Sequence, residues 1–223
     1  MSLSFDVFWS FRSPYSYLAT YKLIGIEREY DVDINVRPVY PLAIRTPDFF
    51  KRVNPMWMSY VSRDCKRLAE MEGVPFALPS PNPIVQDFET LEIAPEQPYI
   101  HRLTRLGVAA AEEGEGLAFI AEVSKLIFGG VNGWHEGKHL AHAAERAGLS
   151  LTELDARVNS NVDAYEAKIR KNETDQKASG HWGVPLMVFN GEPFFGQDRI
   201  NVLLWRMKNA GLRAKANVRQ HNT

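Results

Sequence analysis

The first forty residues constrain the fold most, because they place a helix between two strands that are joined by short connections. Residues 3–10 are rich in Phe, Val and Trp and predict a strand that runs into Ser13 and Pro14. Serine is a preferred helix N-cap and proline is tolerated at the first helical position, so a helix is expected over residues 14–29. Residues 31–40 alternate apolar and polar side chains, as a second strand does. This arrangement predicts two parallel strands joined by a right-handed crossover.

The turn at Ser13 is also a candidate for chemistry. A serine at a helix start presents its hydroxyl next to backbone N–H groups that have no partner inside the helix, and the helix dipole adds positive potential. Such a spot attracts an anion or a thiolate. A plain helix cap is the alternative, and residues 5–19 alone do not decide between the two.

The middle of the chain is expected to be helical. Residues 40–98 carry many prolines, which divide this stretch into loops and short helices around one longer helix over residues 59–72. Ser150 and Glu153 have the spacing of a capping box, which marks the start of another helix. Counting that one, apolar residues at helical spacing predict four further helices, over residues 98–114, 116–128, 135–147 and 150–171.

Strands return near the C-terminus. Two short apolar runs, over residues 186–189 and 193–195, flank Asn190 and Gly191, which is a strong hairpin signal. A last helix follows, with Asp198 as its N-cap and a glycine as its stop. The element order βαβ, helices, ββα is that of an α/β protein with a thioredoxin-like fold and a large α-helical insertion.

We therefore expect a discontinuous domain organisation. Residues 1–40 and 176–215 are expected to form the thioredoxin-like domain, residues 41–175 an inserted helical domain, and residues 216–223 a frayed C-terminal tail. The stretch PFALPSPNPIVQD inside the insertion is too apolar for a linker, so it is expected to pack on the body of the protein.

Composition narrows the classes of function. Lys and Arg number 26 against 27 Asp and Glu, so no footprint for nucleic acid is indicated. The apolar runs fall short of the ~18 residues that span a bilayer, and the N-terminus lacks the pattern of a signal peptide, so we expect a cytoplasmic protein with no membrane partner. Cys65 is the only cysteine, which excludes an internal disulfide and a CxxC redox pair. The histidines at positions 135, 139 and 142 lack the companions of a metal motif, so no metal site is predicted.

Three blocks of sequence together resemble one known family. They are SPYSYLA near the start, NP followed by RDCKRLAEMEGVPF, and WGVPLMVFNGEPFFGQDRI. In this order and spacing they are similar to the 2-hydroxychromene-2-carboxylate isomerases, which sit with the kappa-class glutathione transferases in the DsbA-like branch of the thioredoxin-like proteins. The resemblance implies glutathione as the cofactor and a homodimer. In that family a serine turn, here residues 13–16, takes the place of the DsbA CxxC motif, so the reactive thiol is that of bound glutathione.

The resemblance also implies a glutathione site. Ser13 is expected to be the catalytic residue, because its hydroxyl would donate a hydrogen bond to the glutathione sulfur and favour the thiolate. The bond between Val184 and Pro185 is expected to be cis and to leave the Val184 backbone free for the cysteinyl part of glutathione. The γ-glutamyl end is expected to bind at the start of the last helix, at Gln197, Asp198 and Arg199. An ordinary N-cap at Asp198 and a surface ion pair at Arg199 stay open as alternatives.

The second substrate is expected beside the loop that follows the second strand. Asn54 matches an asparagine of the family, and Tyr15 of the serine turn and Trp182 beside the proline turn are further candidates for contact with it. Core packing is the alternative for Trp182.

Some positions depart from the family pattern. Trp57 is a further candidate for contact with the substrate, although it stands where the resemblance suggests a lysine, and Ser10 stands where many members have an aspartate. Arg12 replaces an apolar residue that is usual beside the serine. The partner of the substrate carboxylate is therefore open, with Arg12, Arg45 and Lys51 as candidates and a solvated side chain as the alternative for each.

The resemblance implies a glutathione-dependent isomerase that interconverts a cyclic hemiketal with a benzylidenepyruvate in aromatic hydrocarbon degradation. Its partner would be a small aromatic-derived molecule, and thiolate addition to the conjugated double bond would allow rotation about it. A kappa-like glutathione transferase or peroxidase is the first alternative. A non-catalytic thioredoxin-like binding protein is the second.

Overall fold

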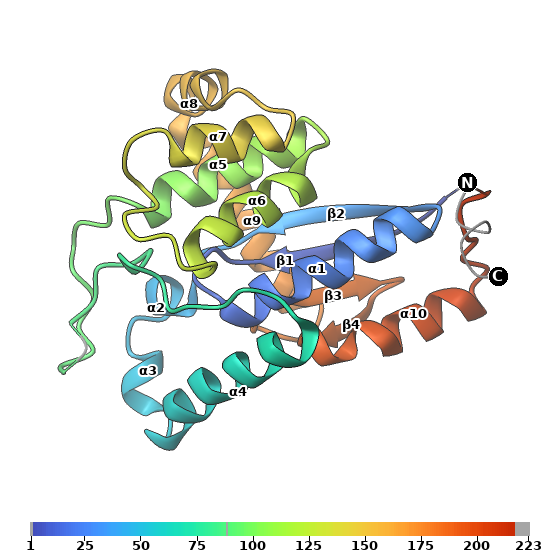
Figure 1. The fold of residues 1–223 in the computed structure, drawn as a ribbon, viewed down its shortest axis with the longest axis horizontal. Helices are drawn as coiled ribbons and strands as arrows, with labels where there is room; N and C mark the ends of the chain where they lie inside the picture. Colours follow the sequence, from blue (N-terminus) through green and yellow to red (C-terminus); the bar gives the residue numbers. More distant parts are fainter. Residues whose placement is uncertain (1, 88, 217–223) are drawn as a thin grey trace.

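The computed structural model describes residues 2–87 and 89–216, which form a mixed four-stranded sheet with helices on both faces (Figure 1). The strands lie in the order β2–β1–β3–β4, where β1 is Leu3–Trp9, β2 is Val32–Pro38, β3 is Leu186–Phe189 and β4 is Glu192–Phe195. β1 pairs in parallel with β2, whereas β3 is antiparallel to both β1 and β4. The predicted parallel pair is thus confirmed.

Helices cover both faces of this sheet and its edge at β2. Helices α1 and α10 lie in front of it and α9 lies behind it, while α5 to α8 form a group at the edge next to β2 (Figure 1). Helix α1 spans Pro14–Glu29, α2 Leu42–Arg45, α3 Phe49–Arg52, α4 Met56–Glu72, α5 Ile100–Glu112, α6 Gly116–Phe128, α7 His139–Arg146, α8 Leu151–Ser160, α9 Val162–Ala178 and α10 Ile200–Asn209, with a 3-10 turn, η1, at Gln197–Arg199. No helix among the described residues is long and apolar enough to cross a membrane.

Local sequence explains the elements that were predicted well. The backbone of Ser13 is extended, and its Oγ accepts a hydrogen bond of 3.1 Å from the N–H of Ser16, so α1 starts with a serine cap as predicted. Asn190 and Gly191 both have positive φ, 51° and 79°, which suits the tight turn between β3 and β4. The predicted hairpin is therefore confirmed.

Three helix boundaries differ from the prediction. The helix expected over residues 150–171 is broken at Asn161, whose φ of −153° ends α8 and starts α9, and α9 then runs on to Ala178. Helix α4 starts at Met56 rather than at residue 59, because the Asn54 Oδ1 accepts a hydrogen bond of 3.0 Å from the Met56 N–H. Helix α7 starts at His139, after a turn that takes up the first residues of the expected helix.

The prediction that Asp198 is the N-cap of the last helix was wrong. Gly196 has a φ of 100°, and the chain turns there into the 3-10 turn η1, so that Asp198 lies inside this turn. Arg199 occupies the N-cap position of α10 and makes no side-chain cap hydrogen bond.

The core joins the sheet to the inserted helices. The ring of Phe11, at the end of β1, packs edge-on against Trp9 with centroids 4.6 Å apart and contacts Phe119 of α6 at 6.3 Å. A Cβ on Gly107 of α5 would lie 2.9 Å from the Phe11 ring, so only glycine allows this approach. Division of the chain into two domains stays a prediction. The expected frayed tail lies outside the described residues apart from Ala216.

Candidate functional site

The turn at Ser13 faces the loop that leads into β3. The Ser13 Oγ donates a hydrogen bond of 3.5 Å to the Val184 carbonyl oxygen, and the peptide bond between Val184 and Pro185 is cis, as predicted. A hydroxyl normally donates to oxygen over a shorter distance, about 2.5–3.0 Å. The Ser13 hydroxyl is therefore weakly held and can be given to a better acceptor.

Several hydrogen-bond donors at this turn have no acceptor among the described residues. Within the described chain, the N–H groups of Tyr15 and Val184 have no hydrogen-bond acceptor. The hydroxyls of Ser10 and Ser16, which flank Ser13, are buried and also lack a partner. Together with the positive end of the α1 dipole, these donors make the turn suitable for a negatively charged atom.

Helix α9 fixes the loop opposite Ser13. Gln176 is fully buried, its Nε2 donates to the Gly183 carbonyl at 2.7 Å, and its Oε1 accepts from the Arg45 Nη1 at 2.8 Å. Arg45 also donates to the Trp182 carbonyl at 3.2 Å, and the His181 Nδ1 accepts from the Gly183 N–H at 2.9 Å. Arg45 is thus occupied in holding the loop. Sequence reasoning missed Gln176 and His181.

An aromatic wall of four residues, Phe49, Phe50, Trp57 and Trp182, stands beside the turn. Ring centroids are 5.1 Å apart for Phe49 and Trp182, 6.2 Å for Phe49 and Trp57, and 6.0 Å for Phe50 and Trp57. Trp57 and Trp182 remain 39% and 46% exposed, so the wall offers apolar surface to a ligand. Sequence reasoning found the two tryptophans but missed the phenylalanine pair of α3, whose adjacent aromatic residues in a proline-rich loop were the available signal.

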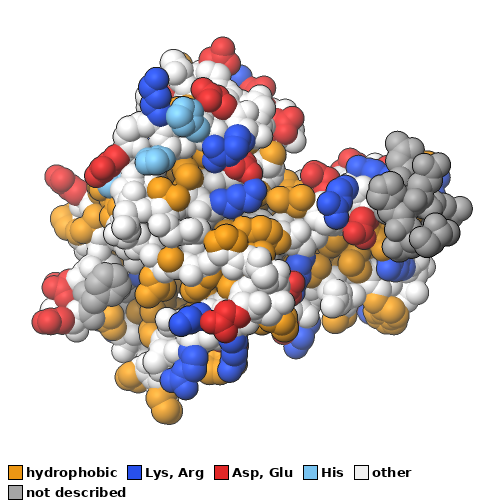
Figure 2. All heavy atoms as spheres, in the orientation of Figure 1, with side chains coloured by type: hydrophobic (Ala, Val, Ile, Leu, Met, Phe, Trp, Pro, Cys, Tyr) orange, Lys and Arg blue, Asp and Glu red, His pale blue; other side chains and the backbone are white. Residues whose placement is uncertain are grey.

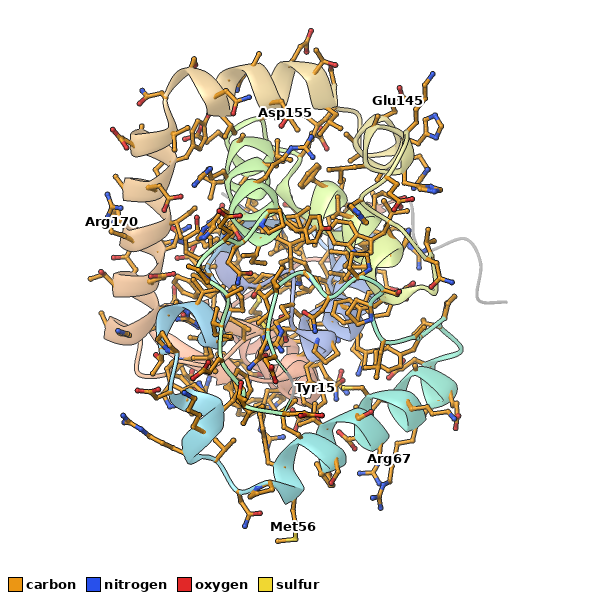
Figure 3. All side chains as sticks on the ribbon, turned by 90° about the vertical axis from the view of Figure 1, so that its left-hand side faces the viewer. Tyr15, Met56, Arg67, Glu145, Asp155 and Arg170 are labelled. Carbon is orange, nitrogen blue, oxygen red and sulfur yellow. The ribbon has the colours of Figure 1, made fainter. Side chains whose placement is uncertain are left out.

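Helices α3 and α4 bring the wall to the turn. Tyr15 lies between these two helices in the view of Figure 3. Its hydroxyl donates to the Asp64 Oδ2 on α4 at 2.7 Å, and burial together with this hydrogen bond raises the pKa of Tyr15. The lower tip of the molecule, where α4 begins, is covered by hydrophobic side chains (Figure 2), and Met56 there is 71% exposed. Tyr15 therefore ties α4 to the start of α1 and stays protonated.

Arg12 lies partly buried beside Ser13. Its Nε donates to the Asn82 Oδ1 at 3.3 Å and its Nη2 to the Gln86 Oε1 at 2.7 Å, while the guanidinium lies 5.3 Å from the centroid of the Phe50 ring. Burial lowers the pKa of Arg12 to about 10, so the group is still charged at neutral pH. Arg12 contacts the aromatic wall through Phe50.

Other predicted site residues lie in ordinary structural roles. The Gln197 Oε1 accepts a hydrogen bond of 2.8 Å from the Lys22 Nζ, and Asp198 pairs with Arg199 at 2.8 Å on the surface, where their side chains are 60% and 55% exposed. The Asn54 Oδ1 accepts from the N–H of Met56, the first residue of α4, as described above. The structure does not bring these four predicted residues, Gln197, Asp198, Arg199 and Asn54, into direct contact with Ser13. In the part of the chain that the structure describes, no group of three or more His, Cys, Asp or Glu side chains is arranged to hold a metal ion.

Comparison with known proteins agrees with the fold. A family model described as the DSBA-like thioredoxin domain matches residues 5–208. The structure of a 2-hydroxychromene-2-carboxylate isomerase superposes with a TM-score of 0.71 at 20% sequence identity, over 93% of this chain and 96% of the other. A probable DsbA oxidoreductase from Streptomyces coelicolor gives 0.65 at 16% identity, over 93% of this chain and 89% of the other.

A third structure is the cytosolic disulfide reductase DsbM from Pseudomonas aeruginosa with GSH, which gives a TM-score of 0.56 at 14% identity over 93% of this chain and 100% of the other. No curated protein matches the sequence. Identities this low show a shared fold and leave the reaction to be argued from the site. The predicted thioredoxin-like fold with inserted helices is confirmed, and the chain belongs to the DsbA-like thioredoxin domain family.

Proposed function

We propose that this protein is a glutathione-dependent isomerase of the 2-hydroxychromene-2-carboxylate type. The observation that carries the proposal is the juxtaposition of the Ser13 hydroxyl, at a helix N-terminus, with the unpaired N–H of Val184 on the opposite loop. These groups suit a short peptide that bears a thiol, because the loop offers backbone hydrogen bonds while the helix end favours negative charge on sulfur. A similar fold is found in a protein with this isomerase name and in DsbM with GSH, which supports the proposal.

The weakly held Ser13 hydroxyl and the unpaired Val184 N–H support a glutathione site. The Val184 backbone would pair with its cysteinyl residue, the Ser13 hydroxyl would donate to its sulfur, and Gln197, Asp198 and Arg199 would hold its γ-glutamyl end. When bound, glutathione supplies a nucleophilic thiolate that can add to a conjugated double bond.

The protein's own groups would keep the sulfur charged and orient the second substrate. A free thiol has a pKa near ~8.5, and a helix N-terminus lowers it, so the donors at Ser13 and Tyr15 increase the thiolate fraction at neutral pH. The aromatic wall would exclude water from one face of a flat substrate and hold it by ring contacts. Ser13 therefore combines the role of helix cap with that of hydrogen-bond donor to sulfur.

A kappa-like glutathione transferase or peroxidase is the second candidate. The exposed faces of Trp57 and Trp182 favour it, because a partly open wall admits varied electrophiles. A thiol oxidoreductase of the CxxC type is disfavoured, since serines occupy the turn and Cys65 is the only thiol. The proposal also includes a cytoplasmic location and a homodimer, both carried over from the sequence as expectations.

Turnover of two substrates tests the proposal. Purified protein with millimolar glutathione should isomerise a benzylidenepyruvate faster than it conjugates 1-chloro-2,4-dinitrobenzene, and glutathione alone should raise the melting temperature because a ligand of the native state stabilises it. Faster conjugation would favour the transferase. Absence of both a thermal shift and turnover would favour a non-catalytic binding protein.

A further inference from the structure

Arg12 is a partly buried cation without a counter-ion among the described residues. Two other partly buried arginines in this chain hold carboxylates: Arg37 pairs with Asp6 at 2.9 Å, and Arg105 pairs with Glu166 at 2.7 Å. No carboxylate of the described residues lies within 4.0 Å of the Arg12 guanidinium. Desolvation of a cation is unfavourable unless an anion or a full set of acceptors compensates it.

Asn82 and Gln86 hold this cation in one orientation. The Asn82 Oδ1 that accepts from Arg12 also accepts from the Ile84 N–H at 3.1 Å, and the Gln86 amide is fixed by its own hydrogen bond to the Leu91 carbonyl at 3.2 Å. Both acceptors are neutral amide oxygens, so they orient the guanidinium without cancelling its charge. Asn82 and Gln86 thus fix the position of the Arg12 guanidinium, and its positive charge is not neutralised by any carboxylate of the described residues.

One edge of the guanidinium remains available. The Arg12 Nη1 donates to none of the described residues, yet it is not among the buried polar atoms that are sealed from solvent without a partner. Phe50 of the aromatic wall lies against the guanidinium, and Ser13 is the next residue in the chain. A ligand that reaches Ser13 and lies along the wall therefore passes this free edge.

We propose that Arg12 binds a carboxylate of the ligand at the Ser13 site, and that it makes the site selective for anionic over neutral ligands. The proposal rests on the proposed function, because Ser13 marks the reacting end of the ligand. The carboxylate belongs either to a second substrate with a flat apolar body, which matches the wall beside Arg12, or to glutathione itself. A guanidinium presents two parallel N–H groups in one plane, which match the two oxygens of a carboxylate. A lysine ammonium offers the charge but not this geometry.

Exposed basic side chains lie near the same end of the molecule. Figure 2 shows Lys and Arg side chains over α4, whose exposed members are Arg63, Lys66 and Arg67. These charges are solvated and screened, so they raise the local concentration of an anion without selecting its shape. Selection is assigned to Arg12, because, unlike Arg63, Lys66 and Arg67, it is desolvated and held in one orientation, whereas Arg45 is occupied by Gln176 and the Trp182 carbonyl.

Binding measurements on the full chain test the proposal. The probes are trans-benzylidenepyruvate, its neutral methyl ester, and glutathione, with binding followed by calorimetry. Arg12→Met should weaken binding of the acid at least tenfold and leave the ester within about twofold, because a charge-assisted hydrogen bond is lost only for the acid. The matched control is Arg52→Met, which removes an arginine of α3 whose side chain is 78% exposed, and it should leave all three affinities unchanged.

The outcomes separate the two sources of the carboxylate. A tenfold loss for glutathione with no change for the acid would support the proposal and assign the carboxylate to glutathione. Equal effects of Arg12→Met and Arg52→Met, or equal losses for acid and ester, would overturn it.

A second variant keeps the test valid if Arg12→Met does not fold. Arg12→Lys keeps the charge without the parallel N–H groups, so it should weaken acid binding several-fold, and unchanged binding would count against the proposal. The proposed function can fail separately: a protein that binds no glutathione but still prefers the acid to the ester through Arg12 would refute the isomerase and retain the anion site.

Discussion

Removing the Ser13 hydroxyl separates its two roles. In the structure the Ser13 Oγ accepts from the Ser16 N–H at 3.1 Å, so Ser13→Ala loses one helix cap. Loss of a serine cap costs about 1 kcal/mol, which corresponds to a fall of about 2–4 °C in Tm for a chain of this size. If the hydroxyl also donates to a thiolate, a charge-assisted hydrogen bond of about 1.5–3 kcal/mol disappears as well. That loss predicts a fall of about ten- to a hundredfold in glutathione-dependent kcat/KM.

The chain contains a matched control for this experiment. Ser150 caps α8, where its Oγ accepts from the Glu153 N–H at 3.4 Å, on the side of the insertion away from the sheet. Ser150→Ala removes the same kind of cap by the same substitution. The two variants should therefore lose similar stability in urea denaturation, while only Ser13→Ala loses activity.

The assay is isomerisation of a benzylidenepyruvate at saturating glutathione, followed by its ultraviolet absorbance. A Ser13→Ala protein that turns over at the native rate would refute the catalytic role and leave Ser13 as a cap. Equal loss of activity in Ser13→Ala and Ser150→Ala would also refute it, because the effect would then follow stability rather than the hydroxyl at the site.

Three further predictions concern the loop opposite Ser13 and the lone thiol. Gln176→Leu should lower the free energy of unfolding in urea by about 3 kcal/mol, because it leaves the Arg45 Nη1 and the Gly183 carbonyl unpaired. It should also weaken glutathione binding in calorimetry, because the loop becomes less rigid. Burial lowers the pKa of His181 below its ordinary 6.5, so the unfolded chain binds a proton at this side chain at a higher pH than the native protein does. The contribution of His181 to stability should therefore be fully present above about pH 6.5 and be lost as the pH falls below it. His181→Asn should remove this part of the pH dependence in melting curves. Burial raises the pKa of Cys65 to about 12, so the native protein should react with a disulfide reagent at pH 8 far more slowly than the urea-unfolded chain, and similar rates would contradict the burial.

Strong local patterns made much of the fold predictable. The alternation of β2 and the serine cap of α1 each depend on neighbouring residues, and Asn190 with Gly191 specifies a turn by conformation alone. The break at Asn161 had no such signal, because neither glycine nor proline interrupts the helical pattern there. Asp198 looked like a cap because acidic residues suit that position, whereas the positive φ of Gly196 moved the turn upstream.

The site was predictable only in part. Ser13 and Pro185 stand in short sequence blocks whose order and spacing carry the resemblance, so the sequence was enough to predict that they lie at the same site. Gln176 joins the Gly183 carbonyl, seven residues later in the chain, to Arg45, 131 residues away, and no local pattern encodes the second contact. The cradle of Arg12 likewise comes from amides 70 and 74 residues away in sequence.

The electrostatics of the scaffold explain why its chemistry would need a borrowed thiol. The start of α1, with its unpaired donors and dipole, is where a sulfur would lose its proton most easily, and the chain places Ser13 there. Its one cysteine, Cys65, lies buried in α4, where burial and the negative charge of Asp64 raise the thiol pKa to about 12. The thiol of Cys65 thus stays protonated, while the start of α1, which favours a thiolate, carries a serine instead of a cysteine. A ligand that brings a thiol to Ser13 would complete this arrangement, and the guanidinium of Arg12, whose charge has no carboxylate partner among the described residues, would give an anionic ligand a second point of attachment.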